Sequence, residues 1–197
     1  MHPTGRFPSF RMKRQMCWDS PAELNWLRLL DADSEVLEFR EQPCTIYYRL
    51  DGVEHWHIPD TWVRTADGST FWEVKATKDS ARADVAARTA LLSADCPAHG
   101  YQYRVAIAED LRREPRLRNV RLLLRRGRVP ITFGQRELCR RLFLRDQEFS
   151  WQAIVEGLLE PLTMSVACRL VLEGTLEVDL DQELSSQTIR VVRSISE

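Results

Sequence analysis

Lysine and long apolar runs are scarce in this chain of 197 residues. Only three of its 28 basic residues are lysines, namely Lys13, Lys75 and Lys78, and the rest are arginines. No stretch approaches the roughly 18 consecutive apolar residues that cross a bilayer, which argues against a membrane protein. The first residues also lack the apolar segment of a secretory signal. We therefore expect a cytoplasmic protein without membrane contact.

Paired cysteines are absent as well. The chain has five cysteines, an odd number, and none stands in a C-x-x-C pair. This spacing argues against a disulfide scaffold or a zinc ribbon and is typical of reduced thiols in the cytosol. With 44% hydrophobic and 29% charged residues, the composition is that of one or two globular domains rather than a disordered chain.

The net charge of the whole chain is close to zero, but its segments carry large charges of opposite sign. The formal net charge is -1, with 28 basic and 29 acidic residues. Residues 1–103 carry 12 basic and 15 acidic side chains, residues 104–145 carry 13 and 4, and residues 146–197 carry 3 and 10. The basic middle segment favours a polyanionic partner, whereas the acidic tail favours protein contacts.

Hydrophobic patterns predict an α/β or α+β domain in the first two thirds of the chain. A helix begins after Ser20, with Pro21 in its first turn. Alternating patterns then predict strands, which two Asp-Gly turns separate, and a second helix and further strands follow. The expected strands are residues 36–39, 44–50, 54–58, 61–65, 70–75, 101–108 and 120–124, and the second helix is 80–94.

The character of the sequence changes near Pro130. Three helices are expected at residues 135–144, 150–159 and 161–172, and two strands at 175–180 and 188–192. Three helices followed by a small β-wing are typical of a winged-helix module. The predicted domains are therefore 1–129 and 130–197.

A candidate site for chemistry lies on two of these strands. Pro59-Asp60 and Glu73-Val74-Lys75 flank the Asp67-Gly68 turn, so a hairpin brings them together. Glu73 and Lys75 share one strand face, because side chains alternate. Two converging carboxylates and the Val74 carbonyl form an oxygen site suited to Mg²⁺, with Mn²⁺ as an alternative. Lys75 would then orient the attacking water and stabilise charge on a phosphate.

Each of these residues also has a structural interpretation. Glu23 is a third candidate carboxylate, for the same ion or a second one, but Ser20-x-x-Glu23 also matches a helix capping box. Asp60 is equally compatible with a simple turn. Glu73 and Lys75 are equally compatible with an exposed charge pair.

Further candidates are histidines and arginines. His55 and His57, two residues apart on a strand, are a weaker candidate for a metal site, because Mg²⁺ prefers oxygen ligands. Basic residues of the middle segment are phosphate-contact candidates, or else a solvated face. The predicted DNA-binding residues are Lys78, Arg112, Arg113, Arg116, Arg118, Arg125, Arg126 and Arg128.

Together, these motifs resemble the PD-(D/E)xK nuclease superfamily, and more narrowly the TnsA-like endonuclease subunit of heteromeric transposases. The resemblance rests on Glu23, residues 36–43, Ile58-Pro59-Asp60 and Trp72-Glu73-Val74-Lys75, together with residues 100–105 and 118–120. It implies a restriction-endonuclease-like mixed sheet flanked by helices, followed by a winged-helix-like domain. It also places Glu23, Asp60, Glu73 and Lys75 in the family's catalytic positions.

The resemblance further implies a function and partners. We expect a Mg²⁺-dependent DNA endonuclease that cuts the 5' ends of a transposon, while a DDE-type transposase acts on the 3' ends. An ATP-dependent regulator would select the target, and the protein would work on double-stranded DNA at the bacterial nucleoid. Two alternatives remain open: a freestanding restriction, repair or junction-resolving nuclease, and a noncatalytic DNA or protein adaptor.

Overall fold

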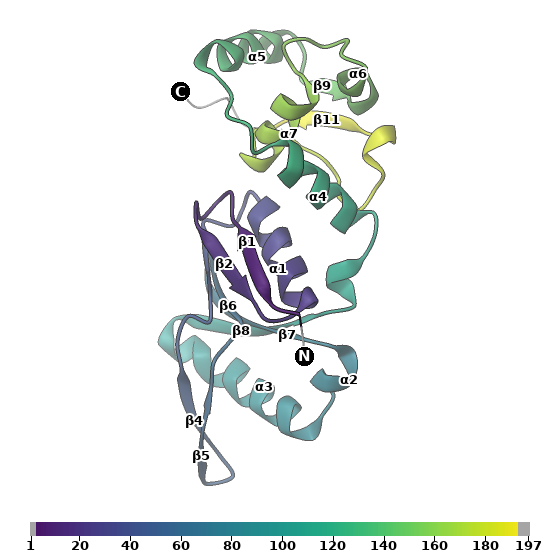
Figure 1. Ribbon diagram of the computed structural model, residues 1–197. Coiled ribbons are helices and arrows are strands. Elements are labelled where there is room, and N and C mark those ends of the chain that lie inside the picture. Colours follow the sequence, from purple (N-terminus) through teal and green to yellow (C-terminus); the bar gives the residue numbers. More distant parts are fainter. Residues whose placement is uncertain (1–2, 193–197) are drawn as a thin grey trace. The chain divides into compact units, whose positions relative to one another are not determined.

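A computed structural model describes residues 3–192, which form two compact units (Figure 1). The first contains the residues up to Asp31 and Glu35–Arg113, and the second contains Ala32–Ser34 and the residues from Glu114 onward. Residues 114–129, which the sequence analysis assigned to the first domain, thus group with the second unit. The reason is helix α4 (Arg116–Arg126), whose buried side packs against α7 (Met164–Leu172).

The first unit is built around a mixed four-stranded sheet in the order β3-β6-β7-β8. β6 is antiparallel to both β3 and β7, and β7 is parallel to β8. Figure 1 shows α1 on one face of this sheet and α3 on the other, an arrangement that fits the restriction-endonuclease-like fold. The bounds are α1 Pro21–Ala32, β3 Glu38–Glu41, β6 Thr61–Thr65, β7 Gly68–Lys75, α2 Thr77–Ser80, α3 Ala83–Asp95, η1 Cys96–His99, β8 Tyr101–Ile107 and η2 Asp110–Arg112.

The alternation of side chains along β7 produces the two packed layers. Phe71 lies on the face that packs with Leu92 of α3. Val74 and Trp72 lie on the opposite face, where the Trp72 ring stacks at a tilt against Trp26 of α1, with 4.9 Å between the ring centroids. The Trp72–Val74 face is thus apolar and packed, and the alternation directs the intervening Glu73 toward α3.

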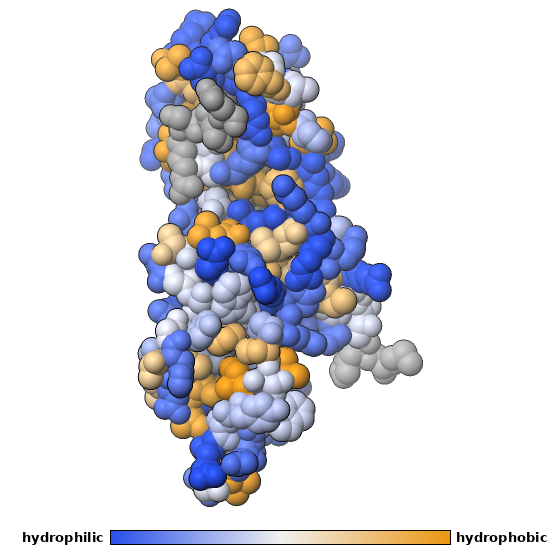
Figure 2. Space-filling view, turned by 90° about the vertical axis from the view of Figure 1, so that its left-hand side faces the viewer, coloured by the Kyte–Doolittle hydropathy of each residue, from blue (hydrophilic) through white to orange (hydrophobic). Residues whose placement is uncertain are grey.

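Strands β4 (Ile46–Leu50) and β5 (Val53–His57) form a separate hairpin that projects from the sheet (Figure 1). Tyr47 and Trp56 lie directly opposite each other, and they are 81% and 66% exposed. Figure 2 shows polar and apolar atoms side by side at the tip of this hairpin, the lowest part of the view. The sequence pattern predicted the hairpin but not the exposure of its aromatic pair.

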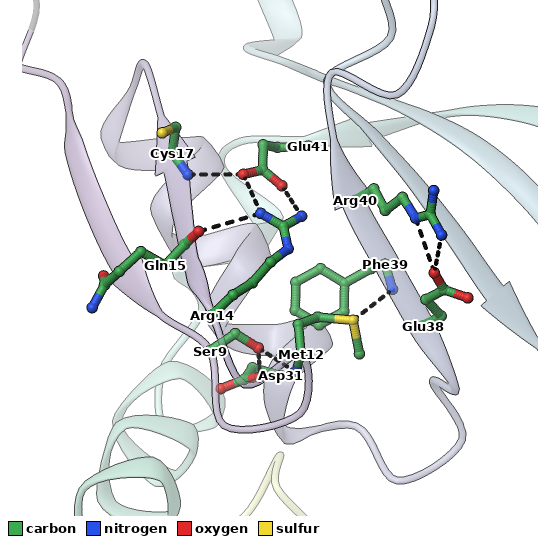
Figure 3. A network of polar contacts seen from close by, with 10 residues as sticks. All are labelled: Ser9, Met12, Arg14, Gln15, Cys17, Asp31, Glu38, Phe39, Arg40 and Glu41. Atoms are coloured by element: carbon green, nitrogen blue, oxygen red, sulfur yellow. Dashed lines mark hydrogen bonds and ion pairs between the residues drawn. The ribbon is translucent and has the colours of Figure 1, made fainter.

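The segment before α1 forms a third hairpin, to which the sequence analysis had assigned no structure. Strands β1 (Gly5–Pro8) and β2 (Gln15–Trp18) are antiparallel. The carboxylate of Asp31 in α1 holds the loop between them. It accepts hydrogen bonds from the Ser9 hydroxyl (Figure 3) and from the amides of Phe10 and Arg11, at 2.5 to 2.9 Å. Arg14 pairs with Glu41 of β3, with 2.5 Å between nitrogen and oxygen. These contacts tie the hairpin to both α1 and the sheet.

The second unit combines helices with a small antiparallel sheet in the order β10-β11-β9. Residues 120–124, predicted as a strand, instead belong to α4. The correction has a clear physical basis, because Leu117, Val120, Leu123 and Leu124 are buried at helical spacing while arginines separate them. The other bounds are α5 Phe133–Arg145, β9 Glu148–Ser150, α6 Trp151–Val155, β10 Leu176–Glu177, η3 Leu184–Ser186 and β11 Thr188–Val191.

Two of the predicted helices are shorter in the structure. The helix expected over residues 150–159 ends at Val155, and the one expected over 161–172 begins after Thr163, whose side chain caps it. All five cysteines are free. Within residues 3–192, no helix is both long and apolar enough to span a bilayer.

Candidate active site

The β6–β7 hairpin brings Asp60 beside Glu73, as the sequence spacing predicts. Thr61 lies opposite Trp72, so Asp60, one residue before β6, reaches the level of Glu73. The Val74 amide donates a hydrogen bond of 2.6 Å to Oδ2 of Asp60. The N–H and C=O of one strand residue point the same way, so the Val74 carbonyl also faces the side on which Asp60 lies.

In the isolated protein, ionisation of the Asp60 carboxyl is unfavourable. Burial and the neighbouring charge of Glu73 raise its pKa from the ordinary 3.8 to about 7, and Glu23 contributes to the rise. The hydrogen bond from Val74 and the charge of Lys75 oppose this rise only in part. A buried and a partly buried carboxylate that repel each other are therefore a defining feature of the site.

Glu73 is almost fully buried and is surrounded by nitrogen atoms. Its Oε1 lies 2.5 Å from Nζ of Lys75 and 3.3 Å from the guanidinium of Arg88, and its Oε2 lies 3.0 Å from Nε2 of His57. Burial alone would raise the pKa of Glu73, but His57 and Lys75 together hold it below its usual value. Glu73 is thus ionised and neutralised by its own neighbours.

His57 occupies a buried position between two polar groups. Its Nε2 lies 3.0 Å from the Tyr103 hydroxyl as well as 3.0 Å from Oε2 of Glu73. Oε2 of Glu73 nevertheless lacks a well-directed hydrogen bond within the described chain. His55 is exposed and stacks against Tyr48. The two histidines therefore have different environments, and no metal site is formed from them in residues 3–192.

Glu23 lies in the first turn of α1, where it forms half of a capping box with Ser20. Its Oε2 accepts a hydrogen bond of 2.8 Å from the Asp19 amide, and its Oε1 lies 2.9 Å from the Ser20 hydroxyl. The Glu23 amide in turn donates to the Ser20 hydroxyl at 3.2 Å. The structure thus shows the capping geometry, and Glu23 is also close enough for its charge to raise the pKa of Asp60.

The acidic groups fit a cation held by two carboxylates rather than three. Across the described residues, no three His, Cys, Asp or Glu side chains converge as metal ligands, so Glu23 does not join Asp60 and Glu73 in one cluster. Mg²⁺ usually keeps several waters and binds one or two carboxylates. Asp60, the unsatisfied Oε2 of Glu73 and the Val74 carbonyl offer a donor set of that kind. The residues present therefore fit a hard divalent cation.

The predicted DNA-binding residues are divided between the two units. Lys78, Arg112 and Arg113 belong to the first unit, and Arg116, Arg118, Arg125, Arg126 and Arg128 belong to the second. Several of them form ion pairs with acidic residues of their own unit. The unpaired positive charge of residues 104–145 is therefore smaller than the net charge of that segment.

Acidic residues far along the sequence neutralise part of α4. Arg116 pairs with Asp181 at 2.9 Å, and Arg118 pairs with Glu183. In the first unit, Arg113 pairs with Asp110 at 2.6 Å. By contrast, Arg125 and Arg126 in the last turn of α4 are exposed, and neither forms an ion pair within residues 3–192.

Arg88 is the site residue that the sequence analysis missed. It lies on α3, between the buried residues Val85 and Leu92, and its side chain is 18% exposed. The signal was present in the sequence, because positions 85, 88 and 92 fall on one helix face. An arginine on an otherwise apolar face indicates a buried partner.

Comparison with known proteins identifies the segment that carries the site. Residues 33–108 match the family described as TnsA-like endonuclease N terminal, whereas no curated protein matches the chain. The matched segment includes Asp60, Glu73 and Lys75 but begins after Glu23, and it ends before Glu114, where the main part of the second unit begins. Over this segment, the chain is therefore similar to the N-terminal domain of TnsA-like endonucleases.

Proposed function

We propose that this chain is a Mg²⁺-dependent DNA endonuclease and the subunit of a heteromeric transposase that cleaves the 5' ends of a transposon. One observation carries the proposal: Asp60, Glu73 and Lys75 meet at the end of the β6–β7 hairpin, inside the TnsA-like segment. An exposed charge pair, the structural alternative for Glu73 and Lys75, does not fit a glutamate whose side chain is only 3% exposed.

Asp60, Glu73 and the Val74 carbonyl would hold the divalent cation, for which Mn²⁺ is a substitute. When bound, the cation acts as a Lewis acid toward the phosphodiester and lowers the pKa of the attacking water. Its charge would also relieve the repulsion that raises the pKa of Asp60. The protein thus tolerates an unfavourable pair of carboxylates, one buried and one partly buried, at the place where positive charge is needed.

Lys75 supplies the ammonium group of the site. Its side chain is 30% exposed and its Nζ lies 2.5 Å from Glu73, so the charged end is fixed at the surface of the buried cluster. In this position Lys75 orients the attacking water and stabilises the negative charge that develops on the phosphate. Removing such a group typically lowers a cleavage rate by about 10²- to 10³-fold.

We assign substrate and partner contacts to both units. Double-stranded DNA at transposon ends is the proposed substrate, and a DDE-type transposase and an ATP-dependent regulator are the proposed partners. In the second unit, the order α5-β9-α6-α7-β10-β11 and the antiparallel sheet support a winged-helix-like domain. The exposed Arg125 and Arg126 are the best-supported phosphate contacts among the predicted arginines.

Cleavage of DNA by the full chain tests this function. The full chain, alone and with the transposase encoded beside it, is incubated with DNA carrying the transposon ends and either Mg²⁺ or EDTA. We expect metal-dependent cleavage at the 5' ends, reduced by about 10²- to 10³-fold in Lys75→Met. Lys13→Met is the matched control, because Lys13 lies in the β1–β2 loop, and it should cleave like the wild type.

The two preparations separate the competing functions. Robust cleavage by the chain alone, without the transposase, would favour a freestanding nuclease. Equal cleavage by Lys75→Met and the wild type would contradict the assigned role of Lys75. No cleavage in any preparation that binds the transposon ends would leave the adaptor as the better description.

A further inference from the structure

Arg88 contacts Glu73 from helix α3, which packs against the sheet that carries the β6–β7 hairpin. Its guanidinium lies 3.3 Å from Oε1 of Glu73, the same oxygen that Lys75 contacts at 2.5 Å. The Nε atom of Arg88 is buried and has no hydrogen-bond partner in the described chain. A buried guanidinium is costly unless a carboxylate compensates it, and Glu73 is the carboxylate that Arg88 contacts.

A count of charges shows what this pairing does to the site. Asp60 and Glu73 contribute two negative charges when both are ionised, and Lys75 and Arg88 contribute two positive charges. With both carboxylates ionised, these four side chains are already neutral as a group before a divalent cation arrives. A nearby guanidinium repels an incoming cation and shares the carboxylate that would bind it.

We propose that Arg88 competes with the divalent cation for Glu73 and so weakens metal binding in the DNA-free protein. This inference rests on the proposed function, because it concerns the same metal site. It differs from the roles of Asp60, Glu73 and Lys75 in that Arg88 acts through Glu73 and is a positioning residue. The nuclease site stays poorly loaded until another anion accepts the guanidinium, and a DNA phosphate is such an anion.

Calorimetric titration of the full chain with Mn²⁺ at pH 8, without DNA, tests the competition. We expect Arg88→Met to bind Mn²⁺ about tenfold more tightly than the wild type, which corresponds to about 1.4 kcal/mol. Arg88→Lys restores a cation and should bind nearly as weakly as the wild type. Arg82→Met is the matched control, because Arg82 caps the same helix but is exposed and pairs with Asp84 at 3.1 Å.

Thermal unfolding of each variant is recorded alongside to check that it folds. If Arg88→Met does not fold, Arg88→Gln replaces it, because glutamine keeps a hydrogen-bonding side chain without the charge. Unchanged or weaker Mn²⁺ binding by a folded, uncharged variant would overturn the proposal. If the wild type nevertheless cleaves DNA with Mn²⁺, only the role of Arg88 is lost. If no variant binds Mn²⁺ and the wild type does not cleave DNA, both this inference and the proposed function fail.

Discussion

The substitution Asp60→Asn should stabilise the protein while removing its proposed activity. The asparagine side chain resembles a protonated aspartate and keeps an oxygen that accepts the hydrogen bond from the Val74 amide. It removes the buried charge whose pKa rises from 3.8 to about 7 in the folded protein. At 1.36 kcal/mol per tenfold change in the acid constant, this rise amounts to about 4 kcal/mol at most.

The sign of the pH dependence follows from the raised pKa. Below pH 4 the Asp60 carboxyl is protonated in both the folded and the unfolded state, so ionisation costs nothing. As the pH rises from about 4 to about 7, the unfolded state loses this proton first, and the wild type loses stability. Relative to the wild type, Asp60→Asn should therefore gain about 2 to 4 kcal/mol at pH 8 and less than about 1 kcal/mol at pH 4.

Guanidinium denaturation in EDTA at the two pH values, followed by tryptophan fluorescence, measures this difference. Trp26 and Trp72, which pack together in the first unit, report on the unit that contains Asp60. Asp67→Asn in the exposed β6–β7 turn is the control, and its effect should be the same at both pH values. If Asp60→Asn is less stable than the wild type at pH 8, the electrostatic description of the site is wrong.

Two further pairs of substitutions test other parts of the structure. Gly127→Ala should destabilise the second unit by about 1 to 3 kcal/mol in denaturant titrations, because a Cβ there would approach the backbone nitrogen of Arg169 to 2.9 Å. Gly134→Ala is the control: a Cβ there meets open space, so the change should be neutral or slightly stabilising. Equal effects of the two substitutions would argue against close packing of α4 and α7. Ser20→Ala should cost about 1 kcal/mol of stability but leave DNA cleavage unchanged in the folded protein. Glu23→Gln should lower cleavage by about tenfold, because the charge of Glu23 acts on Asp60 although Glu23 does not join the metal ligands. Equal cleavage by both variants would restrict Glu23 to capping.

The central hairpin was predictable because its signals are local. Asp67-Gly68 sets the turn, and strand alternation then places Asp60 beside Glu73 and Lys75. The first helix was predictable for the same reason, since Ser20 and Pro21 mark its start. Both predictions depend on residues within a few positions of one another.

The errors arose where the same residues suit more than one type of secondary structure, or where residues that are distant in the sequence meet in the fold. Val120–Leu124 is an apolar run that suits a strand, and only the addition of Leu117 reveals helical spacing. The β1–β2 hairpin is short and is held largely by Asp31, which lies beyond it in the chain. Local patterns do not report such contacts.

Charge was the least predictable property. Residues 104–145 carry a net charge of +9 in sequence, yet Arg116 and Arg118 meet acidic partners 65 positions away in the same unit. Arg88, in turn, lies outside that segment and contacts the candidate active site directly. Whether an arginine is available for function therefore depends on its partner in the folded protein, and composition does not reveal that partner.

A crystal structure of the full chain soaked in Mn²⁺, with anomalous diffraction to locate the metal, tests most directly whether Asp60 and Glu73 form the catalytic centre. The account predicts an anomalous peak bound by Asp60, Glu73 and the Val74 carbonyl, with Arg88 displaced from Glu73. An anomalous peak elsewhere, with Glu73 still paired to Lys75 and Arg88, would contradict it.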